Sequence, residues 1–286
     1  FLISIFFILG LATTVAEAAD PSLVGYWKFD EGSGTTAYDS SNNGYDGTLV
    51  GGVTWVSGRF GSAVELDGSS GYISVPDFTL TTDAITFVAW INGWKGGDWA
   101  PILSSRAVNA CEMNFGDNDT LHYTWNNDSS ATWGWTGGPT IPQDTRTMLA
   151  MTLDPDQAVA YVYTDAAGFT QTTNAIAHIE QTVGALQIGY SYDPRYVQGI
   201  IDEAAIFDRA LTEDEIMSLI SGVGGGYPYA LAPNPANGAI HADTWVTLSW
   251  KGGDYAASHD VYMGENFDEV NDGTGDAFRG NQEADY

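Results

Sequence analysis

The sequence predicts an all-β protein built as an antiparallel sandwich, and two observations lead to this fold class. Turn-type residues recur about every ten positions between residues 22 and 206, in a chain with 34 Gly. The segments between these turns are short and rich in Val, Ile, Thr, Tyr, Phe and Trp, as sandwich strands are. Their alternation is partial, which is expected where strands are buried on both faces. The expected strands are residues 24–29, 63–66, 72–75, 85–91, 121–125, 148–153, 159–163, 185–189 and 200–207.

The first 18 residues have the pattern of a secretory signal peptide. An apolar run over residues 1–11 leads to AEA at residues 16–18, an A-x-A cleavage pattern. The run is shorter than the roughly 20 apolar residues that a membrane span needs. Because the chain begins at Phe1 rather than Met, we expect a signal truncated at its N-terminus and a mature chain from near Asp20. The sequence therefore predicts export to the medium or the cell surface, without a membrane span.

One helix is expected after the last sandwich strand. Thr212 is a suitable N-cap, and Glu215 three residues later completes a capping box. Ile216 and Ile220 share one face, and Gly222 stands where the helix should end. We expect this short helix to pack across an edge of the sandwich or to seal its end.

A change in composition follows the helix. Residues 222–232 are rich in Gly and Pro and indicate a linker. Beyond it, residues 245–253 and 259–267 have the composition of two strands of a second β domain, residues 233–286. That segment is shorter than the roughly 100 residues of an immunoglobulin-like sandwich. We expect it to be an incomplete immunoglobulin-like β domain.

Charge and cysteine content exclude several classes of protein. The chain has 37 acidic and 9 basic residues, a formal net charge of −28, which disfavours nucleic acid and anionic lipid as partners. The same charge would attract divalent cations. Cys111 is the one cysteine, so an intramolecular disulfide is impossible, and we expect this thiol to be buried or merely tolerated.

Four sequence blocks resemble the bacterial laminin G-like domain in order and spacing. They are LVGYWKFDEGSGTTAYDSSNNGYDGTL, GRFGSAVELDGSSGYISVP, ITFVAWI and GIIDEAAIFDRALTEDEI, and the resemblance covers residues 22–221. It implies a concanavalin A-like jelly-roll sandwich. The segment APNPANGAIHADTWVTLSWKGGDYAASHDVYMG is similar to part of the fibronectin type III-like modules of large secreted bacterial proteins.

Glycosidases share the fold that this resemblance implies, and they carry paired carboxylates. A retaining pair lies on one face of a strand with about 5–5.5 Å between carboxyls. Asp202 and Glu203 are adjacent, so regular alternation would point them to opposite faces, and Ala204 stands where a partner for Asp202 is needed. The sequence also lacks the G-x-S-x-G and H-E-x-x-H motifs. We expect no catalytic residues in this chain.

The histidines give no metal or catalytic spacing either. We expect satisfied structural roles for those in strands. The four are His122, His178, His241 and His259.

The stretch DSSNNGYDG, residues 39–47, matches the front half of an EF-hand loop. Asp39, Ser41 and Asn43 occupy positions one, three and five, and Gly44 occupies position six. Val50 stands where the loop needs Glu, and the flanking segments are strand-like, so an EF-hand is excluded.

A calcium site of another kind is nevertheless implied by the resemblance, near where the first and last strands meet. The expected ligands are Asp30, Asp39, Asn43 and Asp202, with Asp46 as a weaker candidate. One structural Ca²⁺ would then pin the 39–47 loop to the closing strands. The alternative is a loop rich in Asp, Asn and Gly simply because turns favour these residues.

Aromatic residues in loops and strand ends are candidates for ligand binding. Sugar rings stack on aromatic faces while amides and carboxylates bond their hydroxyls, and Asn126, Asn127 and Asp128 supply such groups. Trp27 and Trp90 lie inside expected strands and are assigned to the core. The alternative is packing under long loops. The candidates are Trp94, Trp99, Trp125, Trp133 and Trp135.

These observations together predict a secreted bacterial module that binds carbohydrate or another surface component without catalysis. Its partners would be a glycan or an extracellular component, and further domains of the same chain. The sequence is also compatible with a protein-binding or purely structural spacer. A further interpretation is an ancillary domain of a carbohydrate-active enzyme whose catalytic domain lies outside these residues.

Overall fold

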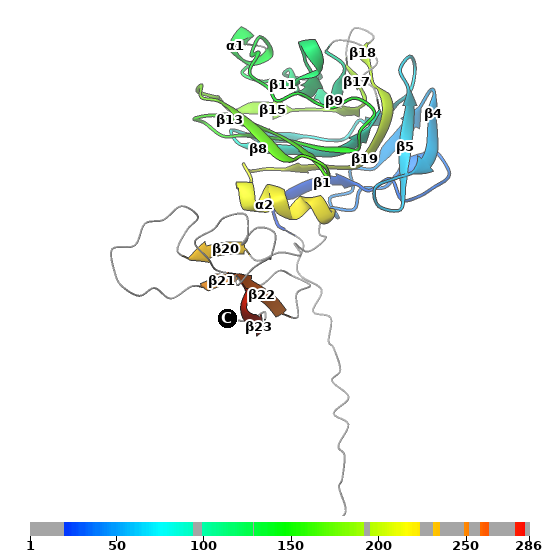
Figure 1. Cartoon of the computed structure of the whole chain (residues 1–286). Helices are drawn as coiled ribbons and strands as arrows, with labels where there is room; N and C mark the ends of the chain where they lie inside the picture. Colours follow the sequence, from blue (N-terminus) through cyan, green and yellow to red (C-terminus); the bar gives the residue numbers. More distant parts are fainter. Residues whose placement is uncertain are drawn as a thin grey trace, which may run out of the picture.

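Two antiparallel sheets packed face to face form the body of the protein (Figure 1). The structure is a computed structural model, and it describes residues 20–93, 99–127, 129–191, 195–223, 231–234, 249–251, 258–262 and 278–283. Sheet I has eight strands and sheet II has seven. The sandwich predicted from turn spacing and strand composition is confirmed.

Sheet I runs in the order β14-β13-β12-β8-β19-β5-β4, and β1 pairs with the second half of β19. Since β5 pairs with the first half, β19 has neighbours along both edges. The strands are β14 (Gly168–Asn174), β13 (Ala158–Thr164), β12 (Thr147–Leu153), β8 (Ile85–Asn92), β19 (Gln198–Phe207), β5 (Ser62–Asp67), β4 (Val53–Ser57) and β1 (Leu23–Trp27).

Sheet II runs in the order β11-β10-β9-β16-β6-β3-β2. Its strands are β11 (Leu121–Thr124), β10 (Cys111–Phe115), β9 (Pro101–Ser105), β16 (Leu186–Ile188), β6 (Tyr72–Val75), β3 (Gly47–Val50) and β2 (Thr36–Ala37). Smaller pairs are β7 (Leu80–Thr82) with β15 (Gln181–Val183), and β17 (Tyr190–Ser191) with β18 (Arg195–Tyr196). The helices are α1 (Ser130–Trp133) and α2 (Glu213–Ser218), with 3₁₀ turns η1 (Asp117–Asp119) and η2 (Leu219–Ser221).

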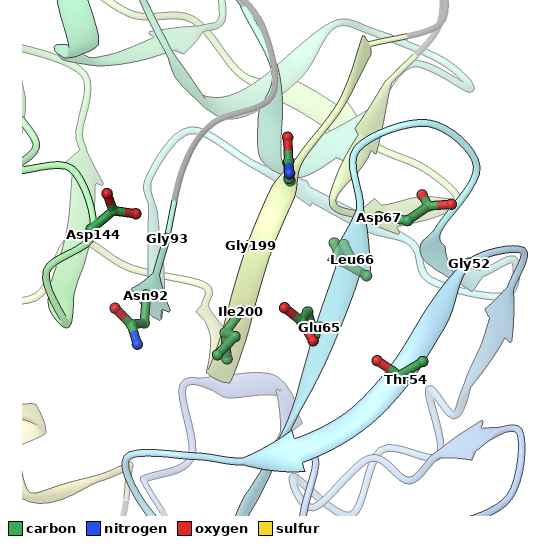
Figure 2. Close-up of a pocket in the computed structure, with 11 residues that line it drawn as sticks. Gly52, Thr54, Glu65, Leu66, Asp67, Asn92, Gly93, Asp144, Gly199 and Ile200 are labelled. Carbon is green, nitrogen blue, oxygen red and sulfur yellow. The ribbon is translucent and has the colours of Figure 1, made fainter.

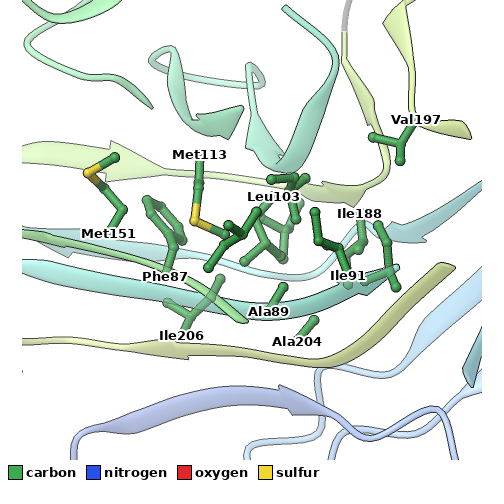
Figure 3. Close-up of a cluster of buried hydrophobic side chains, with 14 of the residues drawn as sticks. Phe87, Ala89, Ile91, Leu103, Met113, Met151, Ile188, Val197, Ala204 and Ile206 are labelled. Atoms are coloured by element: carbon green, nitrogen blue, oxygen red, sulfur yellow. The ribbon is translucent and has the colours of Figure 1, made fainter. Parts of the chain in front are cut away.

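The main core lies between the sheets, where side chains from both point toward one another (Figure 3). Phe87, Ala89 and Ile91 of β8 face Leu103 and Met113 of sheet II. Full burial of a large apolar side chain stabilises the fold by about 1.5–3 kcal/mol. Because the chain has one cysteine and cannot form an intramolecular disulfide, burial of this core stabilises the fold instead.

A second apolar cluster covers the outer face of sheet I. Val88 and Trp90, the residues of β8 that alternate with the core positions, pack there with Phe207 and with Ile216 of α2. Strand β8 is therefore buried on both faces, as its near-continuous hydrophobic run predicted. Figure 1 shows α2 on this side of the sandwich and α1 on the opposite side.

The start and end of α2 follow the sequence prediction. The Glu215 amide donates to Thr212 Oγ1 at 3.3 Å and the Thr212 amide donates to Glu215 Oε2 at 2.8 Å, so the capping box is complete. Gly222 ends the 3₁₀ turn after the helix with φ of 99°, a conformation that favours glycine.

The core assignments of single residues are also confirmed. Trp27 and Trp90 are buried, and so is Cys111. Burial raises the pKa of the Cys111 thiol to about 12, so this thiol stays protonated at neutral pH.

The C-terminal segment contributes two strand pairs to the described residues. They are β20 (Leu231–Asn234) with β21 (Ser249–Lys251), and β22 (Ser258–Tyr262) with β23 (Phe278–Glu283). The fibronectin type III-like domain stays a prediction. The expected signal peptide, residues 1–18, lies outside the described residues, as do Trp94, Asp128 and most of the expected linker. No helix in the described ranges is long and apolar enough to cross a bilayer.

Candidate functional site

The 39–47 loop is fixed to β1 by hydrogen bonds. Asp39 Oδ1 accepts from the amides of Tyr26 at 3.0 Å and Ser41 at 2.8 Å. Asp39 Oδ2 accepts from Ser41 Oγ at 2.8 Å and the Tyr45 amide at 3.0 Å. Asn43 Nδ2 donates to two carbonyls of β1, at 3.2 and 2.9 Å. These hydrogen bonds hold the loop on β1 without a metal ion, and protein donors already occupy both oxygens of the Asp39 carboxylate.

A β-bulge in β19 places two carboxylates on the outer face of sheet I. The register with β8 shifts between Asp202 and Ala205, and Glu203 has φ of 52°. Ile201 and Ala204 on either side both belong to the core between the sheets. The expectation that Asp202 and Glu203 point to opposite faces is therefore wrong, because the bulge interrupts the alternation.

These two carboxyl groups are buried and only partly paired. Asp202 Oδ2 accepts from the amides of Arg59 at 2.6 Å and Phe60 at 3.2 Å, while the Tyr26 hydroxyl donates to Glu203. Asp202 Oδ1 is buried without a hydrogen-bond partner among the described residues. Burial raises the pKa of Asp202 to about 6, and the charge of Asp30 adds to this increase.

The same two causes act on Glu203. Burial, with the charges of Asp202 and Asp30, raises the pKa of Glu203 to about 7, although the Tyr26 hydroxyl opposes the shift. Three carboxyl groups thus interact electrostatically at this point of the fold. A bound cation, or a proton on one carboxyl group, would reduce the repulsion between these three carboxylates.

Asp30 and Asp202 lie on two sides of the loop at residues 58–62. The Ser62 amide donates to Asp30 Oδ1 at 3.0 Å. A Cβ on Gly58 would come within 2.5 Å of Asp202 Oδ2, and one on Gly61 would overlap Asp30 Oδ1. The loop needs glycine where it passes between the carboxylates.

The four predicted calcium ligands therefore separate into two pairs. Asp30 and Asp202 meet at the 58–62 loop, whereas Asp39 and Asn43 are bonded to the backbone of β1. The carboxylate of Asp46 accepts from the Asp39 amide at 2.9 Å. Over the described residues, no group of three or more His, Cys, Asp or Glu side chains is arranged to hold a metal ion.

Of the predicted aromatic ligands, Trp125 is part of the core. It is fully buried, and its Nε1 donates to the Ile179 carbonyl at 2.9 Å. Its backbone amide donates to Thr132 Oγ1 at 3.1 Å, and Ser129 caps α1 through the Ala131 amide. The ligand-binding assignment of Trp125 is wrong. The ring is fully buried and the residue holds the loop that carries α1, so no face of the ring is free to contact a ligand.

Three other predicted aromatics gather around His122. The Trp99 ring lies 5.3 Å from the His122 ring and 6.4 Å from the Trp133 ring, edge to face in both pairs. The Trp135 ring lies 6.3 Å from His122. Trp133 is 42% exposed, while Trp99 and Trp135 are half-buried. The structure thus brings three of the five candidate indoles together, next to the polar residues of the paired strands β10 and β11.

These polar residues lie on the outer face of sheet II. Glu112 of β10 accepts from Arg106 Nε at 2.8 Å and from the hydroxyls of Ser104 at 2.7 Å and Ser191 at 2.6 Å. Burial alone would raise the pKa of Glu112, but the hydrogen bonds and charge of Arg106, with the two hydroxyls, lower it overall. Glu112 is therefore a buried, ionised and well-paired carboxylate.

An open groove lies over the first half of β19. Its volume is about 610 Å³. Figure 2 shows Asn92 and Asp144 on one side of the strand and Thr54 and Glu65 on the other. No aromatic side chain lines it among the described residues, so the groove lacks a platform for stacking.

Glu65 and Asp67 lie on one face of β5 beside this groove, with the two-residue spacing that Asp202 lacks. Alternation along SAVELD could have revealed them. Asp67, however, accepts from the amides of Ser69, Ser70 and Gly71 at 2.8–2.9 Å, and these bonds hold its pKa below its usual range. Asp67 organises a turn and is a poor proton donor.

The two packed antiparallel sheets and the cluster of indole rings around His122 are those of a lectin-like β-sandwich. The chain belongs to the concanavalin A-like lectin/glucanases superfamily, because the Laminin_G_3 family model matches residues 67–217, more than half of the chain. No curated protein matches it.

Two solved structures share this architecture. One is domain 4 of AbnA, a GH43 extracellular arabinanase from Geobacillus stearothermophilus, in complex with arabinotriose. It is 20% identical with a TM-score of 0.53, over 69% of this chain and 98% of that one. The other is the binding domain of Paraclostridial Mosquitocidal Protein 1, 13% identical with a TM-score of 0.50, over 73% of this chain and 56% of that one. At these identities the likeness shows the fold alone.

Proposed function

We propose that this protein is a non-catalytic carbohydrate-binding module. The observation that carries the proposal is the exposed Trp133 ring, backed edge to face by Trp99 and set beside Trp135 above a polar sheet face. Sugar rings present apolar faces to such platforms and hydroxyls to the polar groups beneath. The superfamily, and the arabinotriose bound to domain 4 of AbnA, support a glycan as the ligand class.

The carboxylates support binding rather than hydrolysis. A glycosidase needs a proton donor with access to a sugar. The cavity beside Asp202 has a volume of about 10 Å³, room for one water, and Asp67 is committed to its turn. Neither group has both the protonation and the space that the reaction requires.

Export from the cell is part of the same proposal. The signal-like residues 1–18 support a secreted or surface-attached protein, with residues 233–286 connecting to further domains. A module that adheres to a protein, or that only spaces domains, would bind no sugar. An ancillary role in a carbohydrate-active enzyme is compatible with the same aromatic face.

Removing the Trp133 ring tests the binding proposal. Trp133→Ala should weaken binding of a neutral oligosaccharide about tenfold or more, because stacking is lost while the exposed position tolerates truncation. The measurement is calorimetric titration with arabino-, xylo-, cello- and laminari-trioses. Tyr38→Ala is the matched control, since Tyr38 is 59% exposed and distant in sequence from the three indoles. Equal losses in both variants, or binding unchanged by Trp133→Ala, would contradict the proposal.

We also propose a structural Ca²⁺ held by Asp30 and Asp202. The unpaired Asp202 Oδ1 and the crowding of three acids fit a cation, and backbone carbonyls would complete an oxygen shell. Asp39 and Asn43 fit less well, because backbone and hydroxyl donors occupy both Asp39 oxygens and the Asn43 amide is bonded to β1 through its nitrogen. When bound, the ion would neutralise the buried carboxylates and hold the 58–62 loop to β19.

A thermal scan in EDTA and in millimolar Ca²⁺ tests this assignment. The wild type and Asp39→Asn should both melt at a higher temperature with Ca²⁺, and Asp202→Asn should lose that response. Asp39→Asn is destabilised in both buffers because an amide nitrogen replaces one carboxylate oxygen and cannot accept the hydrogen bonds that this oxygen receives. If the melting temperature of the wild type does not change with Ca²⁺, the metal proposal is wrong, whereas the carbohydrate-binding proposal is unaffected.

A further inference from the structure

Two polar side chains face each other on the outer face of sheet II. Asn114 of β10 and His122 of β11 are partners in the antiparallel register. Their neighbours Met113 and Tyr123 point into the core, so Asn114 and His122 point outward. Directly opposite residues have Cβ atoms about 4.5–5.5 Å apart, close enough to contact one shared group.

Both side chains are buried with polar atoms left unpaired, although Asn114 Nδ2 donates to Glu112 Oε2 at 3.4 Å. Asn114 is 1% exposed and His122 is 2% exposed. Asn114 Oδ1 and both ring nitrogens of His122 have no hydrogen-bond partner in the part of the chain that the structure describes. Buried polar groups are rarely left in this state, because each unmade bond costs free energy. The expectation of a satisfied structural role is wrong for His122, whereas His178, for which none was stated, contacts the Tyr123 hydroxyl at 2.9 Å.

The surroundings of His122 are shaped for a ring. A Cβ on Gly116 would overlap the imidazole, and one on Gly138 would lie 3.4 Å from its Cδ2. On other sides stand the rings of Trp99 and Trp135. Trp99 has φ of 62°, a strained conformation for a bulky residue, which is often found at binding sites.

The hydrogen-bonding groups of Asn114 and His122 are complementary to those of an uncharged hydroxyl group. Desolvation lowers the pKa of His122, against the weaker effects of the Asp117 charge and of the nearby Trp133 backbone, which completes no hydrogen bond to the ring. A neutral imidazole offers one donor and one acceptor, and Asn114 Oδ1 offers an acceptor. Sugar hydroxyls donate and accept in the same way. Asp117, the ionised Glu112 and a net charge of −28 oppose an anionic sugar.

We propose that Asn114 and His122 are the hydrogen-bonding floor of the sugar site, and that this site selects a neutral sugar over an anionic one. The inference rests on the proposed carbohydrate-binding function and assigns the polar contacts of the same site. Hydroxyls of the bound sugar bridge the two strands, and the Trp99 ring moves off His122 to admit them. Trp133 and Trp135 supply the stacking surface.

His122→Phe and Asn114→Leu separate this role from a structural one. Each variant replaces a buried side chain that has unpaired polar atoms by an apolar group of similar shape. His122→Phe should leave the melting temperature unchanged or raise it, whereas Asn114→Leu should lower it slightly because the long bond from Asn114 Nδ2 to Glu112 Oε2 is also lost. Each should weaken binding of the best neutral triose about tenfold, the effect of one lost hydrogen bond to a bound ligand. In the wild type, the ¹⁵N resonances of the His122 ring should shift on adding that triose and not on adding trigalacturonate.

The outcomes divide cleanly between the two proposals. If the wild type binds neutral trioses and both variants bind equally well, the floor assignment falls and the carbohydrate-binding function stands. A lower melting temperature of His122→Phe with unchanged affinity would mean that a buried water satisfies the ring, which also overturns the assignment. Tighter binding of trigalacturonate would overturn the selectivity. If the wild type binds no sugar, both proposals fail.

Discussion

Glu112 shows how one side chain can fix the polar face of sheet II. It is 1% exposed, and its hydrogen bonds come from Ser104 and Arg106 at the end of β9 and from Ser191 of β17. A buried carboxylate is tolerated only when it is paired in this way. Because Asn114 Nδ2 also donates to Glu112 Oε2, at 3.4 Å, the ion pair orients the Asn114 oxygen away from it. The paired acid thereby positions the unpaired amide.

The pH dependence of Glu112→Gln tests that pairing. The folded pKa of Glu112 lies below its unfolded value, so its stabilisation is present above pH 4.5 and is lost as pH falls through the folded pKa. We expect Glu112→Gln to lower the free energy of unfolding by about 2 kcal/mol at pH 7. The difference from wild type should shrink toward zero as the pH falls below 4.5 and passes the folded pKa, since protonated Glu resembles Gln. Urea denaturation across this pH range measures it; a difference that grows in acid would contradict the pairing.

At the scale of elements, β19 pairs with β8, β5 and β1. Its bulge places the carboxyl groups of Asp202 and Glu203 together on the outer face of sheet I. The strands and the capped helix α2 could be predicted, because composition, turn spacing and the Thr212–Glu215 pair are local signals. The bulge could not, because a left-handed Glu203 has no signature in GIIDEAAIF. The burial of Trp125 was also hidden, since its hydrogen bond to Ile179 joins residues 54 positions apart.

The 58–62 loop is the element that the bulge constrains most closely. In Gly58→Ala, the new Cβ would press on Asp202 Oδ2 and on the Ser62 carbonyl at 2.6 Å, so we expect a loss of about 1–3 kcal/mol. Gly34→Ala is the comparison, because its Cβ would meet nothing within 4 Å and only its φ of 85° costs energy, about 1 kcal/mol. Thermal unfolding ranks the two; a Gly58→Ala variant as stable as wild type would show that the loop does not pass between the carboxylates.

At the scale of the whole molecule, the two sides of the sandwich carry different chemistry. Figure 1 shows α2 and α1 on opposite sides of the sandwich. The buried acids of β19 lie on the outer face of sheet I, and the aromatic cluster lies around His122 on the outer face of sheet II. The core between them depends on neither. Substitutions on one side should therefore leave the other unchanged, as is usual for distant sites without shared partners.

The indole N–H resonances of the intact protein test the carbohydrate-binding claim most directly. On titration with a neutral triose, we expect the resonances of Trp99, Trp133 and Trp135 to shift and saturate together. Those of Trp27, Trp90 and Trp125 should stay in place, because these rings are buried in the core or under α2. Shifts confined to the buried indoles, or no shift with any neutral triose, would contradict the account.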